Sequence, residues 1–148
     1  MIAVVQRCSS GRVCVSGEEV GALGARGGLL VLLGVEVGDA SAQAQRMAEK
    51  LCKLRIFDDA AGKMNLAVSD VGGSILLISQ FTLAGDCSGG NRPSFITAQR
   101  PEAAEPLIHE VVQHIVQAAI PVATGRFRTT MEVSMVNDGP VTLIVRVA

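Results

Sequence analysis

Apolar residues fall into short runs separated by glycines, and this pattern predicts a fold built mostly of strands. Residues 2–8 are rich in Val and Ile, while residues 29–33 and 74–81 are nearly continuous apolar runs that suit strands buried on both faces. Shorter strands are predicted at residues 13–15, 20–23, 64–68, 122–124, 131–136 and 141–147.

Two segments have the spacing of amphipathic helices instead. The first begins near Asp39 or Ser41, either of which is a suitable N-cap, and its apolar face consists of Ala44, Met47, Ala48, Leu51 and Leu54. The second begins at Pro101, ends before Pro121, and has an apolar face made of Leu107, Val111, Ile115, Ala118 and Ala119.

Strands therefore outnumber helices, and the connections near Gly17 and at residues 137–139 are short enough for hairpins. We predict an α+β fold: a mostly antiparallel, curved, barrel-like sheet with two main helices packed on it. The length of 148 residues suits a single domain over residues 1–148.

The charge of the chain argues against a general attraction to polyanions. The formal net charge is −1, and the aromatic residues are four Phe with no Trp or Tyr, so the usual base-stacking platform is absent. Any contact with nucleic acid must therefore rest on a local basic patch. The alternative for each cationic residue is that it is an ordinary solvated charge on the surface. The candidates for such a patch are Lys50, Lys53, Arg55, Lys63, Arg92, Arg126 and Arg128.

The cysteines and the apolar runs favour a cytoplasmic protein with free thiols. Cys8, Cys14, Cys52 and Cys87 form no CxxC pair, and the start of the chain has no signal-peptide pattern. The longest apolar run, residues 29–35, is far below the ~20 residues of a membrane helix. We expect no membrane association.

The common catalytic motifs are missing. There is no P-loop, no GxGxxG after a strand, no HExxH and no GxSxG. The two histidines, His109 and His114, lie about 140° apart around the predicted helix and cannot share a face. We therefore expect no metal ion and no cofactor.

One candidate site follows the apolar run that begins at residue 74. Hydroxyl and amide groups at the end of a buried strand, followed by a glycine-rich loop, are typical of a pocket, and the turn adds backbone N–H donors that suit an oxyanion. The alternative is that the hydroxyls only satisfy strand-end hydrogen bonds and that the Phe belongs to the core. The segment comprises Ser79, Gln80, Phe81 and Thr82.

The second candidate segment is Asn-Asp-Gly-Pro at residues 137–140. Asn-Asp-Gly between two strand patterns is a good hairpin turn, which is the simpler interpretation. Pro140 cannot donate to a sheet ladder, so it belongs at a strand start or edge. From sequence alone a trans Gly139–Pro140 bond is favoured, because only ~5–6% of X-Pro bonds are cis.

The stretches MIAVVQRCS, LLVLLGVE, KLRIFDDAAGKMNLAV, SQFTLAGD, NRPSF and VNDGPVTL follow one another over nearly the whole chain. In these stretches and their spacing the sequence resembles the D-aminoacyl-tRNA deacylase family. The combination of SQFT with NDGPVT in one small domain is specific. The loop at residues 85–92 has fewer basic residues than in many members, and residues 125–130 lack the usual Phe-Gly-Ala-type stretch.

The resemblance implies a homodimeric enzyme that hydrolyses the ester between a D-amino acid and the 3′-terminal adenosine of tRNA. Ser79, Gln80, Phe81 and Thr82 then line the pocket for the adenosine and the ester, and Met131 lines the same site. The resemblance also implies that the Gly139–Pro140 bond is cis and reaches into the partner's pocket, and that Arg7 supports this motif.

The family's chemistry is consistent with the residues present. An aminoacyl ester is already activated, so positioning and oxyanion donors supply much of the rate. We expect the nucleophile to be a water molecule that is assisted by the 2′-hydroxyl of the tRNA. Thr82 is the less favoured candidate, because a free hydroxyl is a weak nucleophile. If the carbonyls of Gly139 and Pro140 grip the α-amino group, L residues clash and glycine does not. Side activity on glycyl-tRNA is then expected.

Two other functions stay open at this point. One is a non-catalytic dimeric module on the same fold that binds nucleic acid or protein. The other is a small hydrolase of another ester or thioester with Cys87 as its nucleophile.

Overall fold

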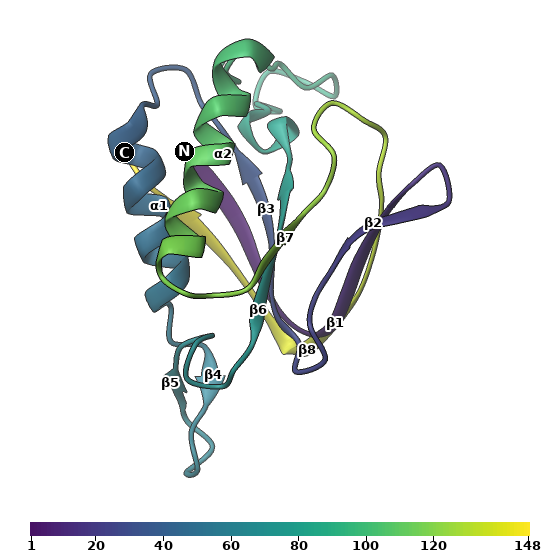
Figure 1. The fold of residues 1–148 in the computed structure, drawn as a ribbon. Coiled ribbons are helices and arrows are strands. Elements are labelled where there is room, and N and C mark those ends of the chain that lie inside the picture. The colour runs from purple at the N-terminus through teal and green to yellow at the C-terminus, as the bar shows by residue number, and fades with distance from the viewer.

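A computed structural model describes residues 1–148 and contains two α-helices, eight strands and one short 3-10 helix (Figure 1). In chain order the elements are β1 (Ile2–Val15), β2 (Glu18–Ala22), β3 (Gly28–Gly34), α1 (Ser41–Lys53), β4 (Phe57–Asp58), β5 (Met64–Leu66), β6 (Ser74–Ser79), the 3-10 helix η1 (Phe81–Ala84), α2 (Pro101–Gln117), β7 (Val122–Thr124) and β8 (Glu132–Arg146).

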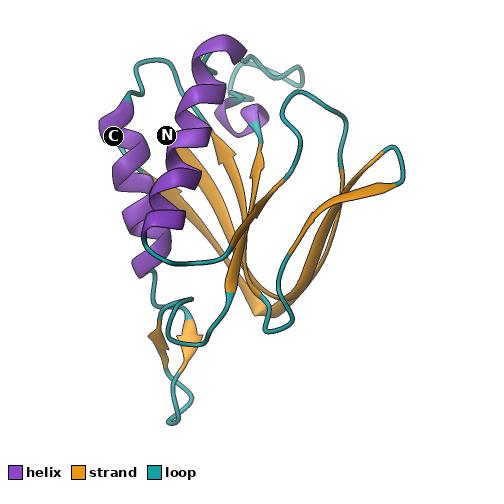
Figure 2. Ribbon diagram, in the orientation of Figure 1, coloured by secondary structure: helices purple, strands orange, loops and turns teal.

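The main sheet is strongly curved and has both helices on one side, as Figure 2 shows. Its strand order is β2-β1-β3-β6-β7, and β8 also pairs with β1. The predicted α+β fold with a barrel-like sheet and two helices is confirmed. The sheet is mixed in detail, because β3 pairs with β6 and β6 with β7 in parallel. The chain segments that contain α1 and α2 act as the crossovers that parallel neighbours need.

The two predicted hairpins have different outcomes. Ser16 and Gly17 have positive φ angles of 50° and 81° and connect β1 to β2 as a tight turn. The hairpin predicted at residues 137–139 is wrong, because β8 runs on as one strand from Glu132 to Arg146. Strand β1 pairs with β8 on both sides of this segment, with register shifts around Cys8 that leave residues 138–141 outside the ladder.

The predicted N-caps of the first helix are also wrong. The N-cap is Ala40, whose N–H donates to the side chain of Gln43 at 3.0 Å. The Asp39 carboxylate is occupied elsewhere, since it accepts hydrogen bonds from the Met1 ammonium and the Glu36 N–H, both at 2.7 Å. The second helix begins at Pro101, as predicted. Neither helix combines the length and the apolar composition needed to cross a bilayer.

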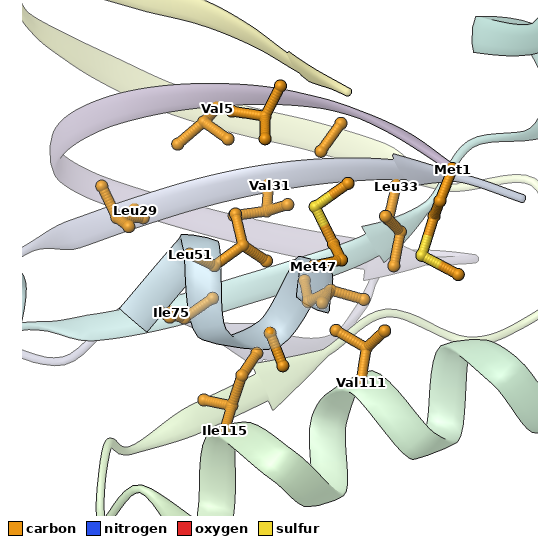
Figure 3. Close-up of a cluster of buried hydrophobic side chains, with 14 of the residues drawn as sticks. Met1, Val5, Leu29, Val31, Leu33, Met47, Leu51, Ile75, Val111 and Ile115 are labelled. Carbon is orange, nitrogen blue, oxygen red and sulfur yellow. The ribbon is translucent and has the colours of Figure 1, made fainter. Parts of the chain in front are cut away.

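The larger hydrophobic core lies between the helices and the sheet (Figure 3). Met47 and Leu51 of α1 and Ile115 of α2 pack there against β3 and β6, and all three are fully buried. A smaller cluster that includes Leu30 and Leu76 fills the opposite face of the same two strands. Strands β3 and β6 are therefore buried on both faces, as their continuous apolar runs predict.

Candidate active site

A cavity of about 730 Å³ opens where β6 ends. Its walls come from the end of β6, the start of η1, the segment that enters α2 and the loop between β7 and β8, and 11 of its 19 lining residues are hydrophobic. Of the predicted site residues, Ser79, Gln80, Phe81 and Met131 line this cavity, and Thr82 lies next to them on η1. The end of β3 also lines the cavity, so four segments distant in sequence meet at the SQFT stretch: residues 33–35, 78–81, 95–108 and 127–133.

The chain turns sharply where β6 passes into η1. The Gln80 N–H donates to the carbonyl of Leu33 at 2.8 Å, which anchors the turn to β3. Phe81 is 59% exposed, so the alternative that places it in the core is wrong. The first N–H groups of a helical turn have no acceptor within it. The N–H groups of Phe81 and Thr82 are therefore suited to a substrate oxygen.

An aromatic pair forms part of the cavity wall. Phe81 and Phe95 pack edge to face, with ring centroids 5.3 Å apart and an interplanar angle of 65°. The loop that carries Phe95 is held by a hydrogen bond from the Thr97 hydroxyl to the carbonyl of Ala84, at 2.6 Å. The exposed ring of Phe81 offers an apolar face on which a nucleobase can stack. Sequence reasoning missed Phe95, although the NRPSF stretch that contains it was a family signal.

No strong base contacts the Thr82 hydroxyl. Its hydrogen-bond partner is the side-chain amide of Gln80, which donates to it. His109 lies within 3.0 Å of Gln113, and His114 lies 3.8 Å from Glu110, both on α2 outside the cavity lining. The lining contains no carboxylate. The arrangement supplies polar positioning groups rather than a side-chain base.

A buried arginine holds the second predicted segment, residues 137–140, in place. Arg7 is 7% exposed, and its Nε donates to the carbonyl of Asp138 at 3.0 Å. Its Nη1 donates to the carbonyl of Ile56 at 2.8 Å and lies 3.3 Å from the Asp58 carboxylate. One guanidinium thus connects β1, β8 and the segment after α1. A planar fork with several donors is well suited to this task.

The segment itself projects from the surface. Gly139 and Pro140 are exposed, and the peptide bond between them is cis. The side chain of Asn137 accepts a hydrogen bond from the Val141 N–H and donates to the Thr142 hydroxyl, both at 2.9 Å. Together with Arg7, these bonds fix the backbone on both sides of the exposed dipeptide.

The cavity and the exposed dipeptide lie far apart on one chain. The strand registers place Ser79 level with Leu33, and Ile75 level with Leu29 and Arg7. Arg7 is thus four residues, about 13 Å, along the strands from the level of Ser79. Along the sheet, β8 is separated from β6 by β3 and β1. Neither Gly139 nor Pro140 lines the cavity of its own chain.

Replacing Arg7 by lysine is expected to lower the free energy of unfolding by about 1–3 kcal/mol. A lysine keeps the charge but cannot reach the carbonyls of Asp138 and Ile56 together, so one buried acceptor loses its partner. Urea denaturation measures the change. Arg12→Lys is the control, because Arg12 is exposed on the same strand, and an equal loss there contradicts the role assigned to Arg7.

The remaining candidates lie outside the cavity lining. Cys87 is exposed on the loop after η1 and does not line the cavity. Cys8 is buried on β1, with its sulfur 3.9 Å from the sulfur of Met135 on β8, and burial raises the pKa of its thiol. The basic residues do not form one patch, since Lys50, Lys53 and Arg55 lie together beside Arg46 at the end of α1. Of the predicted basic residues, Arg128 alone lines the cavity.

A curved α+β fold with a cavity that presents hydroxyl, amide and backbone donors and no strong base suits the hydrolysis of an activated ester. The family model described as D-Tyr-tRNA(Tyr) deacylase matches residues 4–146. The chain belongs to this family of ester hydrolases, and the predicted family and enzyme class are confirmed.

Curated relatives agree over the full length. A D-aminoacyl-tRNA deacylase from Variovorax paradoxus is 56% identical over 149 residues and covers 100% of both chains. One from Halalkalibacterium halodurans is 51% identical over 145 residues, 98% of each chain.

Two solved structures share the fold. One titled c-Myc DNA unwinding element binding protein has a TM-score of 0.91 and 35% identity, and the match covers 100% of this chain and 99% of the other. The second, titled as a probable eukaryotic D-amino acid tRNA deacylase, has a TM-score of 0.81 at 14% identity, with 97% of each chain covered.

Proposed function

We propose that the protein hydrolyses the ester bond of D-aminoacyl-tRNA as a homodimer and releases the free D-amino acid and the tRNA. In this proposal each cavity is completed by Gly139 and Pro140 of the other protomer. The observation that supports it is the separation, within one chain, of the SQFT cavity from a rigidly held, exposed dipeptide. Aminoacyl-tRNA is used in translation, so the protein acts in the cytoplasm.

The reaction needs a water molecule, an oxyanion site and a leaving ribose oxygen. The terminal adenine stacks on the exposed Phe81, which puts the ester carbonyl near the N–H groups at the start of η1. Water attacks the carbonyl carbon with help from the ribose 2′-hydroxyl, and these N–H groups stabilise the oxyanion. The ester C–O bond then breaks, and the proton from water passes to the ribose 3′-oxygen.

The Thr82→Ala variant is expected to keep most of its kcat on D-aminoacyl-tRNA, within about threefold, because the backbone N–H of residue 82 survives the change. Single-turnover hydrolysis measures this. Thr82→Ser is the matched control, since it restores a hydroxyl. If Thr82 were the nucleophile, the serine variant would retain activity and the alanine variant would lose about a thousandfold or more.

Chirality is read from backbone atoms in this proposal. The carbonyls of Gly139 and Pro140 accept hydrogen bonds from the substrate's α-ammonium and crowd one side of its Cα. An L side chain clashes there, whereas a D residue places only hydrogen on that side. The identity of the side chain then has little influence, because only main-chain atoms are gripped.

Glycyl-tRNA is expected to be hydrolysed as a side activity, because glycine has hydrogen on both sides of its Cα. Deacylation of labelled glycyl-tRNA, measured beside D- and L-aminoacyl-tRNA, tests this. No detectable glycyl-tRNA hydrolysis at enzyme concentrations that clear the D substrate contradicts the backbone filter.

The experiment that tests the whole proposal uses three substrates: D-aminoacyl-tRNA, L-aminoacyl-tRNA and a free D-aminoacyl ester. The proposed enzyme cleaves the first and spares the second. A general esterase with Cys87 as nucleophile cleaves the free ester and ignores chirality. A binding module cleaves none of them.

A second candidate function is a non-catalytic module that binds nucleic acid or protein. The observation that favours it is the relative named for binding a DNA unwinding element, at 35% identity and a TM-score of 0.91. Tight binding of DNA by this chain, together with no hydrolysis of D-aminoacyl-tRNA, would establish it. The net charge of −1 argues against nucleic-acid binding as the sole role.

A further inference from the structure

Two charged residues line the cavity, Arg100 and Arg128, and both are positive. They come from separate segments, since Arg100 immediately precedes α2 and Arg128 lies on the loop between β7 and β8. The chain as a whole carries a net charge of −1, so this positive charge is local. A cavity lined by two cationic residues and by no anionic residue favours a ligand that has an anionic group.

Both guanidinium groups are available to a ligand. Arg100 forms no ion pair, and its side chain makes no hydrogen bond within the chain. Its backbone N–H donates to the side chain of Gln99 at 2.9 Å, and its carbonyl accepts from the N–H groups of Ala103 and Ala104. Arg128 lies 3.7 Å from Glu102, but these side chains are 65% and 75% exposed. Such an exposed pair contributes little and exchanges easily for a better acceptor.

The backbone holds Arg128 in a defined position on the cavity wall. Its φ angle is +57°, which is uncommon for a residue other than glycine, and the Thr129 hydroxyl donates to the carbonyl of Arg126 at 2.9 Å. The loop is therefore turned locally at this residue. Its neighbours Phe127, Thr129 and Thr130 also line the cavity.

We propose that Arg100 and Arg128 bind the phosphate that joins the terminal adenosine of the tRNA to the preceding nucleotide. This inference rests on the proposed function and adds a binding site to it. The ester lies at the SQFT end of the cavity and the adenine on Phe81, which leaves the 5′-phosphate of the same nucleoside for the two arginines. Guanidinium groups match phosphate oxygens with paired hydrogen bonds. Neither arginine touches the reacting atoms, so both are binding residues.

The test uses a double variant, Arg100→Gln with Arg128→Gln, and two probes that need no hydrolysis. The dinucleotide CpA contains one phosphate, and adenosine contains none. The Kd of CpA is expected to rise about tenfold in the double variant because charge-assisted hydrogen bonds are lost. The Kd of adenosine is expected to stay unchanged. Glutamine keeps the side chain long and adds no backbone strain at residue 128.

A matched control separates phosphate binding from a general loss of charge. Arg126 lies two residues from Arg128, pairs with Glu18 at 4.0 Å and is absent from the cavity lining. Arg126→Gln is expected to leave both Kd values unchanged. For D-aminoacyl-tRNA the double variant should raise KM about tenfold with kcat unchanged. In the double variant, the plot of the log of the tRNA association constant against the log of the salt concentration should also be less steep by about 0.7, because one phosphate contact is lost.

Two outcomes overturn the inference. In one, the wild type binds CpA no more tightly than adenosine. In the other, the double variant weakens CpA and adenosine equally, which indicates a structural role for the arginines. Failure of the wild type to cleave D-aminoacyl-tRNA is a separate result. It rejects the proposed function, while the dinucleotide measurement still decides whether the phosphate site exists.

Discussion

Replacing Gly139 by alanine is expected to lower kcat/KM on D-aminoacyl-tRNA by about a hundredfold, the cost of misplacing a positioning group by roughly 1 Å. The φ angle of Gly139 is +136°, a conformation that L side chains rarely adopt. A Cβ there would lie 2.7 Å from Val141 Cγ2, 3.0 Å from the Val141 nitrogen and 3.2 Å from Arg7 Nη2. The backbone must therefore shift, and the carbonyls proposed to select the substrate shift with it.

The matched control for this variant is Gly17→Ala. Gly17 also has a positive φ of +81°, but a Cβ there meets nothing within 4 Å. Its replacement costs stability through backbone strain alone, about 1 kcal/mol, and should leave kcat/KM unchanged. Thermal unfolding of both variants shows whether each remains folded. A folded Gly139→Ala protein with wild-type activity on the D substrate and no activity on the L substrate would reject the backbone filter.

The sequence predicted the elements with strong local patterns. Strands β3 and β6 were recognisable because an uninterrupted apolar run fits a strand buried on both faces, and Met47 and Leu51 marked the buried side of α1. The parallel pairing of β6 was not foreseen, because strand direction depends on how α1 crosses over the sheet. That crossing is a tertiary contact with no local signal.

The error at residues 137–139 has a similar origin. Asn-Asp-Gly is a strong turn signal locally, but β1 is long enough to pair with β8 on both sides of it. The ladder therefore continues past the segment. The segment is held by a hydrogen bond from Arg7 to the carbonyl of Asp138, which is 131 positions away in the sequence. Local turn propensity was overridden by pairing between the two ends of the chain.

The candidate site was predicted in part. The polar residues after β6 do line the cavity, because a strand end followed by a glycine-rich loop places side chains beside open space. Phe95 and Arg100 line the same cavity only because the loop at residues 85–100 folds onto η1. Hydrogen bonds such as that from the Thr97 hydroxyl to the carbonyl of Ala84 stabilise this arrangement. No spacing rule in the sequence indicates such a contact.

Two variants that are each strongly impaired are expected to regain activity when their chains are mixed. Gly139→Ala leaves the cavity intact and impairs the dipeptide. Ala98→Trp is designed to do the reverse, because Ala98 lines the cavity and is half-buried there, so that a large side chain fills the space for the adenosine. If the dipeptide acts on the partner's cavity, a mixed dimer has one intact combination and one doubly impaired combination.

Co-expression or subunit exchange of the two variants measures this restoration. In a symmetric dimer, random association makes half of the dimers mixed, and each has one working site of two. The mixture should therefore recover about a quarter of wild-type kcat at equal total protein. A chain that carries both substitutions is the control, since it restores nothing with either single variant. If the single variants also recover nothing although mixed dimers form, each dipeptide serves its own chain or neither, and the proposal of a shared site is rejected.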